Sequence, residues 1–136
     1  MNREIKDWIT TEFETLDFNS KRLETRFKTV INDLSDQPDK SIWLATGSRT
    51  NAKAAYRLIA NEKCTKQNIL KAHKNATHNR SKNENILLAI QDTMAVNYAN
   101  HTKTENLGYN CEQNLGINVH TCLLLTPQGI PLVLQL

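Results

Sequence analysis

The chain has 136 residues, of which 39% are apolar and 23% are charged, with a formal net charge of +3. This length allows one domain, or a small domain together with part of another. The sequence predicts neither a membrane-spanning helix, which needs about 18 consecutive apolar residues, nor a signal peptide. Its cysteines, Cys64, Cys111 and Cys122, have no zinc-binding spacing and fit a reducing, cytosolic setting.

The positive charge is concentrated in the middle of the chain. Residues 41–82 hold nine Lys or Arg against one acidic residue, a net charge of +8. Residues 1–40 hold seven basic against nine acidic residues, and residues 83–136 hold one against four, giving −2 and −3. This asymmetry predicts a polyanionic partner, nucleic acid or an anionic membrane surface, and the alternative is an ordinary solvated face. Membrane binding is the weaker option because residues 65–80 lack the large apolar residues that insert into lipid.

The first two-thirds of the chain has the spacing of amphipathic helices. One helix is predicted around Ile5, Trp8, Ile9 and Phe13. A second is predicted to begin after Asn19 or Ser20, since both are favourable N-caps, and to end in the polar stretch 35–40. The predicted buried stripe of this second helix is Leu23, Phe27, Val30, Ile31 and Leu34.

Two further helices are predicted in the basic middle. One follows Gly47 and ends near Asn61, and its apolar face is predicted to hold Ala52, Ala55, Tyr56 and Ile59. On this basis we expect Tyr56 to pack in the core. The next helix is predicted to be capped by Thr65 and to run through Ile69, Leu70, His73 and Ala76, before a polar loop at 81–85.

The last third is predicted to form strands. The apolar run 86–90 suits a strand buried on both faces, and 119–125 is rich in residues that favour extended structure. Thr126-Pro127-Gln128-Gly129 has the residues of a type I turn, so 119–125 and 130–136 should form an antiparallel hairpin. The chain closes on apolar residues, and a short sheet with an apolar outer edge is unusual in a complete domain. We therefore expect further strands and covering helices after residue 136.

Two groups of residues have types suited to chemistry. The first is the basic middle, where Lys and Arg side chains, Ser hydroxyls and backbone N–H groups can contact phosphates. Arg22 and Arg26, four residues apart, fall on one face of the second helix and add to the same surface. The second is Asp92, which follows the predicted strand 86–90 and could bind a metal ion, although an isolated Asp is more often a turn former or helix cap. Two-metal sites need several converging carboxylates.

These segments resemble a known family. Lys40-Ser41-Ile42, Ala52-Lys53-Ala54-Ala55-Tyr56-Arg57 and Asn61 resemble the N-terminal domain of insertion-sequence-four-type transposases, the group that includes the transposon-five transposase. Leu88-Ala89-Ile90-Gln91-Asp92-Thr93, then Asn97-Tyr98 and Val119-His120-Thr121, resemble the start of the same family's catalytic domain. The resemblance runs over essentially the whole chain. It departs from the family at Leu58, where Phe is usual, and at Met94, where a second Thr is common.

The resemblance implies an α+β chain, with a helical DNA-binding domain at 1–82 and the first strands of an incomplete ribonuclease-H-like domain at 83–136. Members of this family bind the inverted-repeat ends of their element as double-stranded DNA, dimerise, and cut and rejoin DNA. An Asp, Asp, Glu set holds two Mg²⁺ or Mn²⁺ ions, and Asp92 matches the first Asp, so it is the expected catalytic and metal-binding residue. The expected DNA contacts are Arg22, Arg26, Lys40, Ser41, Lys53, Tyr56 and Arg57.

The length of the chain changes what the resemblance implies. The second Asp and the Glu of the family have no counterpart within 136 residues, so we expect a truncated cut-and-paste transposase that binds ends without cleaving DNA. We also expect a bacterial, cytoplasmic and nucleoid-associated protein with no membrane partner. The alternative is a DNA-binding protein without catalysis. It would compete or dimerise with an intact transposase, or be a functionless remnant.

Overall fold

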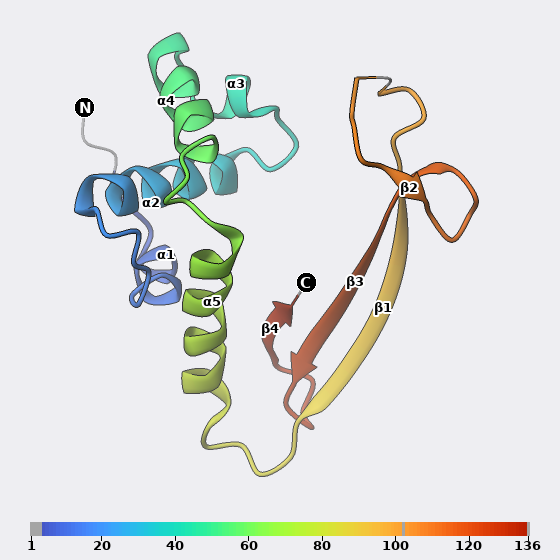
Figure 1. Cartoon of the computed structure of the whole chain (residues 1–136). Helices are drawn as coiled ribbons and strands as arrows, with labels where there is room; N and C mark the ends of the chain where they lie inside the picture. Colours follow the sequence, from blue (N-terminus) through green and yellow to red (C-terminus); the bar gives the residue numbers. More distant parts are fainter. Residues whose placement is uncertain (1–3, 102, 136) are drawn as a thin grey trace. The chain divides into compact units, whose positions relative to one another are not determined.

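A computed structural model of the chain describes residues 4–101 and 103–135, and of residues 133–135 only the backbone. The chain divides into two compact units, Met1–Asn79 and Arg80–Leu136, which we call the helical unit and the sheet unit (Figure 1). The helices are α1 (Asp7–Glu12), α2 (Lys21–Asp36), α3 (Ile42–Ala45), α4 (Arg49–Ile59) and α5 (Lys66–Ser81). The strands are β1 (Leu88–Asn97), β2 (Gly108–Tyr109), β3 (Leu115–Leu125) and β4 (Pro131–Gln135). The predicted order, helices followed by an antiparallel sheet, is confirmed.

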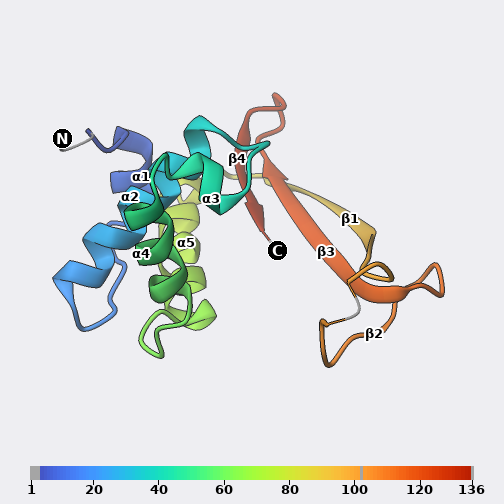
Figure 2. The same ribbon diagram turned by 90° about the horizontal axis from the view of Figure 1, so that it is seen from above.

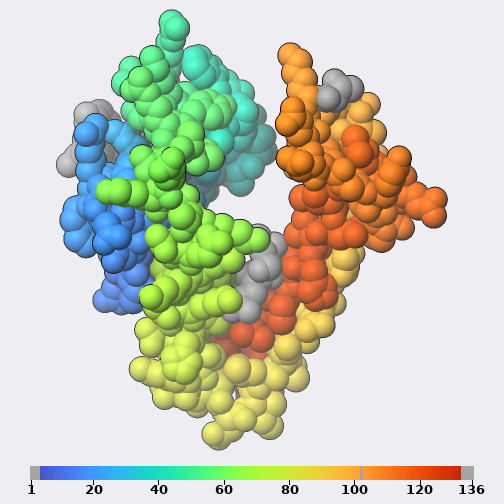
Figure 3. Space-filling view, viewed as in Figure 1, coloured from blue at the N-terminus to red at the C-terminus, as the bar shows by residue number. Residues whose placement is uncertain are grey.

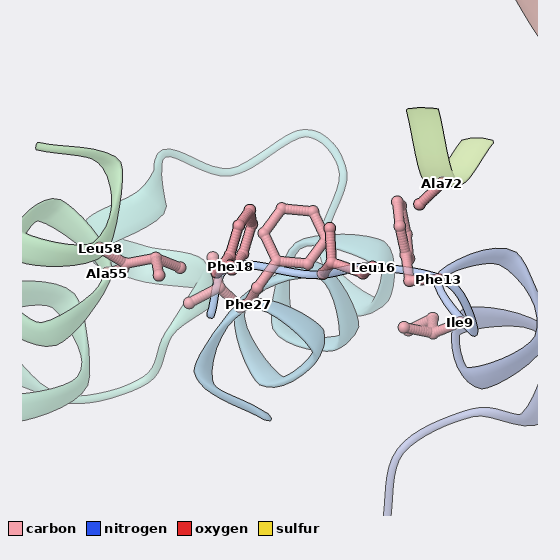
Figure 4. Packing of buried hydrophobic residues seen from close by; sticks show 9 residues of the cluster. Ile9, Phe13, Leu16, Phe18, Phe27, Ala55, Leu58 and Ala72 are labelled. Carbon is pink, nitrogen blue, oxygen red and sulfur yellow. The ribbon is translucent and has the colours of Figure 1, made fainter. Parts of the chain in front are cut away.

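The helical unit has a hydrophobic core to which four of its helices contribute. Phe27 of α2 lies at the centre, and its ring contacts those of Phe13 and Phe18 edge to face, with centroids 4.9 and 5.7 Å apart. Such aromatic pairs stabilise a core beyond the area that they bury. Side chains from α1, α2, α4 and α5 converge on this cluster (Figure 4). Its buried members are Ile9, Phe13, Leu16, Phe18, Phe27, Val30, Ala55, Leu58 and Ala72.

The helix boundaries follow from the capping residues that the sequence offers. Gly47, at a φ of 67°, ends α3 in the left-handed conformation that glycine adopts without strain. Ser48 then caps α4, because its Oγ accepts the Asn51 N–H at 3.2 Å. Thr65 caps α5 as predicted, accepting the Asn68 N–H at 3.2 Å. The helix α3 is an element that the sequence did not predict.

Polar contacts fix the helices that flank the core. The buried carboxylate of Glu24 in α2 accepts the Phe18 N–H at 3.2 Å and lies 3.0 Å from the Lys21 ammonium. His73 of α5 contacts the Glu12 carboxylate of α1 through its Nδ1 atom. These contacts hold the start of α2, and join α5 to the end of α1.

The sheet unit is built around β3, which pairs antiparallel with β1, β2 and β4. The ladder between β1 and β3 runs without interruption from Leu88 opposite Leu125 to Asn97 opposite Gly116, and the two strands lie side by side in both views (Figure 2). The predicted hairpin between the last two strands is confirmed, and its turn closes with Gly129 N–H donating to the Thr126 carbonyl at 2.9 Å. Of the predicted final strand, Leu136 lies outside the described residues.

Several predictions about burial are wrong. The run 86–90 is not buried on both faces, since Ile86 is 62% exposed and Ile90 is 53% exposed. On α4, Leu58 is buried in place of Tyr56 and Ile59, and on α1 Trp8 is also exposed. Helical periodicity is too coarse to choose between neighbouring positions at the edge of an apolar stripe. Among the described residues, no helix is long and apolar enough to cross a membrane.

Candidate nucleic-acid interface

Helix α4 separates its charged residues from its apolar ones. Ala52, Ala55 and Leu58 are buried against the rest of the helical unit. The exposed side carries cations at intervals of four residues, which places them along one stripe of the helix. This stripe consists of Arg49, Lys53 and Arg57. Because Ala52, Ala55 and Leu58 face the rest of the helical unit, the opposite side of α4, which carries the stripe, lies at the surface.

An apolar hollow with a basic lining lies along this stripe. It has a volume of about 470 Å³, and its lining comes from α3, from α4 and from the residue that follows α4. The lining residues are Trp43, Arg49, Lys53, Tyr56, Arg57 and Ala60. The cyan and green segments that carry α3 and α4 lie at the surface of the helical unit (Figure 3).

Two smaller hollows share residues with this one and extend the surface. A hollow of about 200 Å³ is also lined by Trp43 and Arg49, together with the turn between α3 and α4. A hollow of about 380 Å³ is also lined by Arg57, and adds Arg22 from the start of α2 and Lys63 from the loop after α4. The shared residues make the three hollows one connected surface, which we call the α4 face.

The cations of the α4 face are available to bind an anion. Within residues 4–101 and 103–135, Arg49, Lys53 and Arg57 form no ion pair. A helix stripe of unneutralised cations concentrates positive potential on one side of a domain. The arrangement suits contact with a series of phosphates, since each cation can pair with one of them.

The start of α2 is positioned by the Glu24 carboxylate, which holds Arg22 near the α4 face. The hydrogen bond from Lys21 holds the pKa of Glu24 below its ordinary value, with a further contribution from the Phe18 N–H, while burial acts in the opposite direction. The same contact raises the pKa of Lys21. Glu24 therefore stays ionised at neutral pH and fixes the first turn of α2, where Arg22 lies.

The predicted contact residues fall into two groups in the structure. Lys53, Tyr56 and Arg57 come together in the central hollow, and Arg22 joins Arg57 in the adjoining one. Tyr56, expected to pack in the core, is instead half exposed and lines the hollow.

Arg26, Lys40 and Ser41 line none of these three hollows. The Lys40 ammonium lies 3.1 Å from the Asp39 carboxylate. The Ser41 Oγ accepts the Leu44 N–H at 3.4 Å and caps α3. Ser41 therefore has a structural role next to Trp43.

The aromatic residue Trp43 and the cations Arg49 and Lys63 also line the α4 face and were not predicted as contacts. Arg49 could have been found from its spacing, since it precedes Lys53 and Arg57 by four and eight residues. Trp43 and Lys63 carry no comparable signal. They reach the face because Gly47 turns the chain between α3 and α4, and because the loop after α4 returns toward α2.

Asp92 lies in a different environment from the one predicted. It does not follow the end of a strand, because β1 continues to Asn97 and places Asp92 mid-strand opposite Thr121. Its Oδ1 accepts the Thr93 N–H at 2.9 Å, and the residue is exposed. Across residues 4–101 and 103–135, no three His, Cys, Asp or Glu side chains gather into a group that could hold a metal ion. Asp92 alone does not fit a two-metal site, which needs several carboxylates.

Comparison with protein families agrees with the location of the α4 face. The family model described as transposase DNA-binding matches residues 5–64. This stretch contains α1 to α4 and every residue that lines the three hollows. The chain therefore carries a transposase-related DNA-binding segment within its helical unit.

Proposed function

We propose that the helical unit binds double-stranded DNA through the α4 face, and that its specific target is the inverted-repeat end of a transposon. The observation that carries this proposal is the stripe of Arg49, Lys53 and Arg57 beside an open hollow, within the stretch that matches transposase DNA-binding segments. Arg22 and Lys63 extend the same surface at one end.

The dimensions of α4 suit a helix that lies against a DNA groove. Its 11 residues span about 16 Å at about 1.5 Å per residue, and the major groove is about 12 Å wide and admits an α-helix. Cations along one side of such a helix can reach phosphates at the groove edge. These contacts would orient the protein without reading sequence.

Salt dependence gives a quantitative expectation for this mode of binding. If Arg22, Arg49, Lys53, Arg57 and Lys63 each neutralise one phosphate, the logarithm of affinity should fall with the logarithm of salt concentration with a slope of about −4.5. Removing two of these cations should make the slope shallower by about 2.

The decisive experiment compares two double variants that remove equal charge. Lys53→Ala with Arg57→Ala removes two cations of the α4 face, and Lys71→Ala with Lys74→Ala removes two exposed cations of α5 that line none of the three hollows. Fluorescence anisotropy would measure binding to a duplex of the inverted repeat and to a scrambled duplex. We expect the first pair to lose most of the affinity and the second to lose little. Equal losses would show that the overall positive charge, and not the α4 face, binds DNA. Equal affinity for both duplexes would contradict end recognition.

For the sheet unit we propose that β1, β3 and β4 are strands of a ribonuclease-H-like domain in which Asp92 is the first carboxylate. The Mg²⁺ or Mn²⁺ ions of that family would need further carboxylates beside Asp92, and the described residues supply none in a group. The chain alone would then bind DNA without cleaving it. A nicking assay with Mg²⁺ tests this, and cleavage that is lost in Asp92→Ala would contradict it.

A second function is supported by the difference between the helical unit, which carries the α4 face, and the sheet unit, in which Asp92 has no grouped carboxylates among the described residues. A chain with a complete α4 face and an isolated Asp92 would occupy transposon ends without processing them, and so compete with an intact transposase or dimerise with it. Adding the chain to a transposition reaction should lower the yield. The Lys53→Ala, Arg57→Ala double variant should not lower it if competition for DNA is the cause.

A further inference from the structure

The central hollow of the α4 face contains two aromatic side chains that phosphate binding does not require. Trp43 and Tyr56 are each 50% exposed and line the same hollow as the cationic stripe. Lys and Arg alone are enough to bind a DNA backbone. The aromatic pair therefore needs its own physical explanation.

Neither aromatic residue is explained by packing in the core. Both lie outside the buried cluster around Phe27. In the part of the chain that the structure describes, neither Trp43 nor Tyr56 makes a ring–ring contact. A half-exposed Trp and Tyr with free ring surface, next to cations, form the kind of surface that stacks on nucleobases.

The size of the hollow favours an entire base over a smaller group. At about 470 Å³ it falls in the range of small-molecule sites, about 300–1,000 Å³. A paired base in a continuous duplex presents only its edge to a protein, because its faces are covered by the neighbouring bases. Only an unpaired or extruded base can offer a face to Trp43 and Tyr56.

We infer that the α4 hollow binds one unpaired nucleobase, stacked on Trp43 or Tyr56, while Arg49, Lys53 and Arg57 hold the phosphates on either side of it. This inference rests on the proposed DNA binding and adds a preference for duplexes that carry an extruded base. The complementarity is direct, since a nucleotide joins a planar aromatic base to an anionic phosphate. The hollow likewise places an aromatic lining beside three cations.

Three duplexes that differ at one position test the inference. The first is fully paired, the second carries a single extra adenosine, and the third carries an abasic site in place of that adenosine. Anisotropy should show the adenosine bulge bound about 5- to 150-fold more tightly than the abasic bulge, the range expected for stacking of one base. At least one of Trp43→Ala and Tyr56→Ala should reduce this ratio, whereas Tyr56→Phe should keep it because the ring remains.

A matched control and a second readout separate stacking from misfolding. Trp8→Ala removes the chain's other tryptophan, which is also exposed but lies on α1 and lines none of the three hollows, so it should leave the ratio unchanged. In a Trp8→Phe background the emission of Trp43 should be quenched by the adenosine bulge and not by the abasic bulge. Circular dichroism of each variant confirms that the helices are intact.

Two outcomes would overturn the inference and leave DNA binding in place. One is equal affinity for the adenosine and abasic bulges, which would mean that the protein recognises only a distorted backbone. The other is an adenosine preference that survives in Trp43→Ala and in Tyr56→Ala. Failure to bind any of the three duplexes in a salt-dependent manner would instead contradict the proposed function itself.

Discussion

The two units of the chain differ in whether their large apolar side chains are buried or exposed. The helical unit buries aromatic and aliphatic side chains around Phe27 and presents cations on the α4 face. The sheet unit exposes large apolar side chains along one face of β1, where Leu88, Ile90 and Met94 alternate with residues of the other face. The uninterrupted register with β3 places Leu125, Leu123 and Val119 opposite them, on the same face.

This difference shows which unit gains stability from its own residues. Buried apolar area is the main favourable contribution to folding, and the helical unit has this area within itself. In the sheet unit the ladder of β1 and β3 supplies hydrogen bonds, but the described residues leave its apolar face open. Substitutions in the two units should therefore differ in how much they lower stability. DNA affinity should depend on the stability of the helical unit.

The largest difference is expected between Phe27→Ala and Ile90→Ala. Phe27 is buried and contacts two other phenylalanine rings, so its truncation should lower the free energy of unfolding of the helical unit by about 3–5 kcal/mol. Ile90 is exposed, and its truncation should change the free energy of unfolding of the sheet unit by less than about 0.5 kcal/mol. Urea unfolding followed by far-ultraviolet circular dichroism measures both. Similar losses would mean that the apolar face of the sheet is covered.

A smaller but specific effect is expected in the sheet unit at Gly116. A Cβ atom there would lie 2.0 Å from the Val96 carbonyl oxygen, whereas a Cβ at Gly108 would meet nothing within 4 Å. Gly116→Ala should therefore destabilise the pairing of β1 with β3 by about 1–3 kcal/mol, as overpacking does. Hydrogen exchange of β3 amides should increase in Gly116→Ala and not in Gly108→Ala. Unchanged exchange in both variants would show that the paired ends of β1 and β3 separate at little cost in free energy.

Much of the helical unit could be predicted because local signals and tertiary packing agree there. Gly47, Thr65 and the N-cap region at Asn19 and Ser20 mark helix ends through backbone chemistry that acts over a few residues. The hairpin of β3 and β4 was predictable for the same reason, since the turn residues lie next to each other in sequence.

Burial was harder to predict because it depends on partners far away in the chain. The spacing of α4 allowed either Leu58 or Ile59 on the inner face, and packing against α2 selected Leu58. The run 86–90 has the composition of a buried strand, but exposure depends on whether another layer covers it. The position of Asp92 was missed for a related reason, since the partner β3 extends the ladder five residues beyond it.

The candidate site was predictable in its charge and not in its shape. Lys53 and Arg57 stand out within a basic segment, and their spacing puts them on one helical stripe. The hollow beside them exists only because α3 brings Trp43 to α4, and α3 is a short helix without a strong periodic signal. Sequence therefore indicated a polyanion partner, and the structure adds a hollow lined by aromatic and cationic side chains.

A pH-dependent effect is expected at Glu24. Through this residue the stability of the helical unit, unlike that of the sheet unit, should depend on acid. The folded-state pKa of Glu24 lies below the unfolded value of about 4.3. Its contribution to stability is therefore complete above that pH and is lost as the pH falls through the folded pKa. Glu24→Gln should lower the free energy of unfolding of the helical unit by about 1.5 kcal/mol at neutral pH. The difference between the two proteins should shrink in acid, and a constant difference would contradict the role of the charge.

The smallest effect is expected from Ser48→Ala, and it connects stability to binding within the helical unit. Ser48 caps α4 through a 3.2 Å hydrogen bond from the Asn51 N–H, and removing such a cap costs about 1 kcal/mol. Fraying of the first turn would release Arg49 from the stripe, so DNA affinity should fall severalfold while the ladder of β1 and β3 keeps its protection from hydrogen exchange. Ser48→Thr, which retains the hydroxyl, should restore both stability and affinity. If the affinity falls equally in Ser48→Thr, the serine itself contacts DNA and its role is not that of a cap.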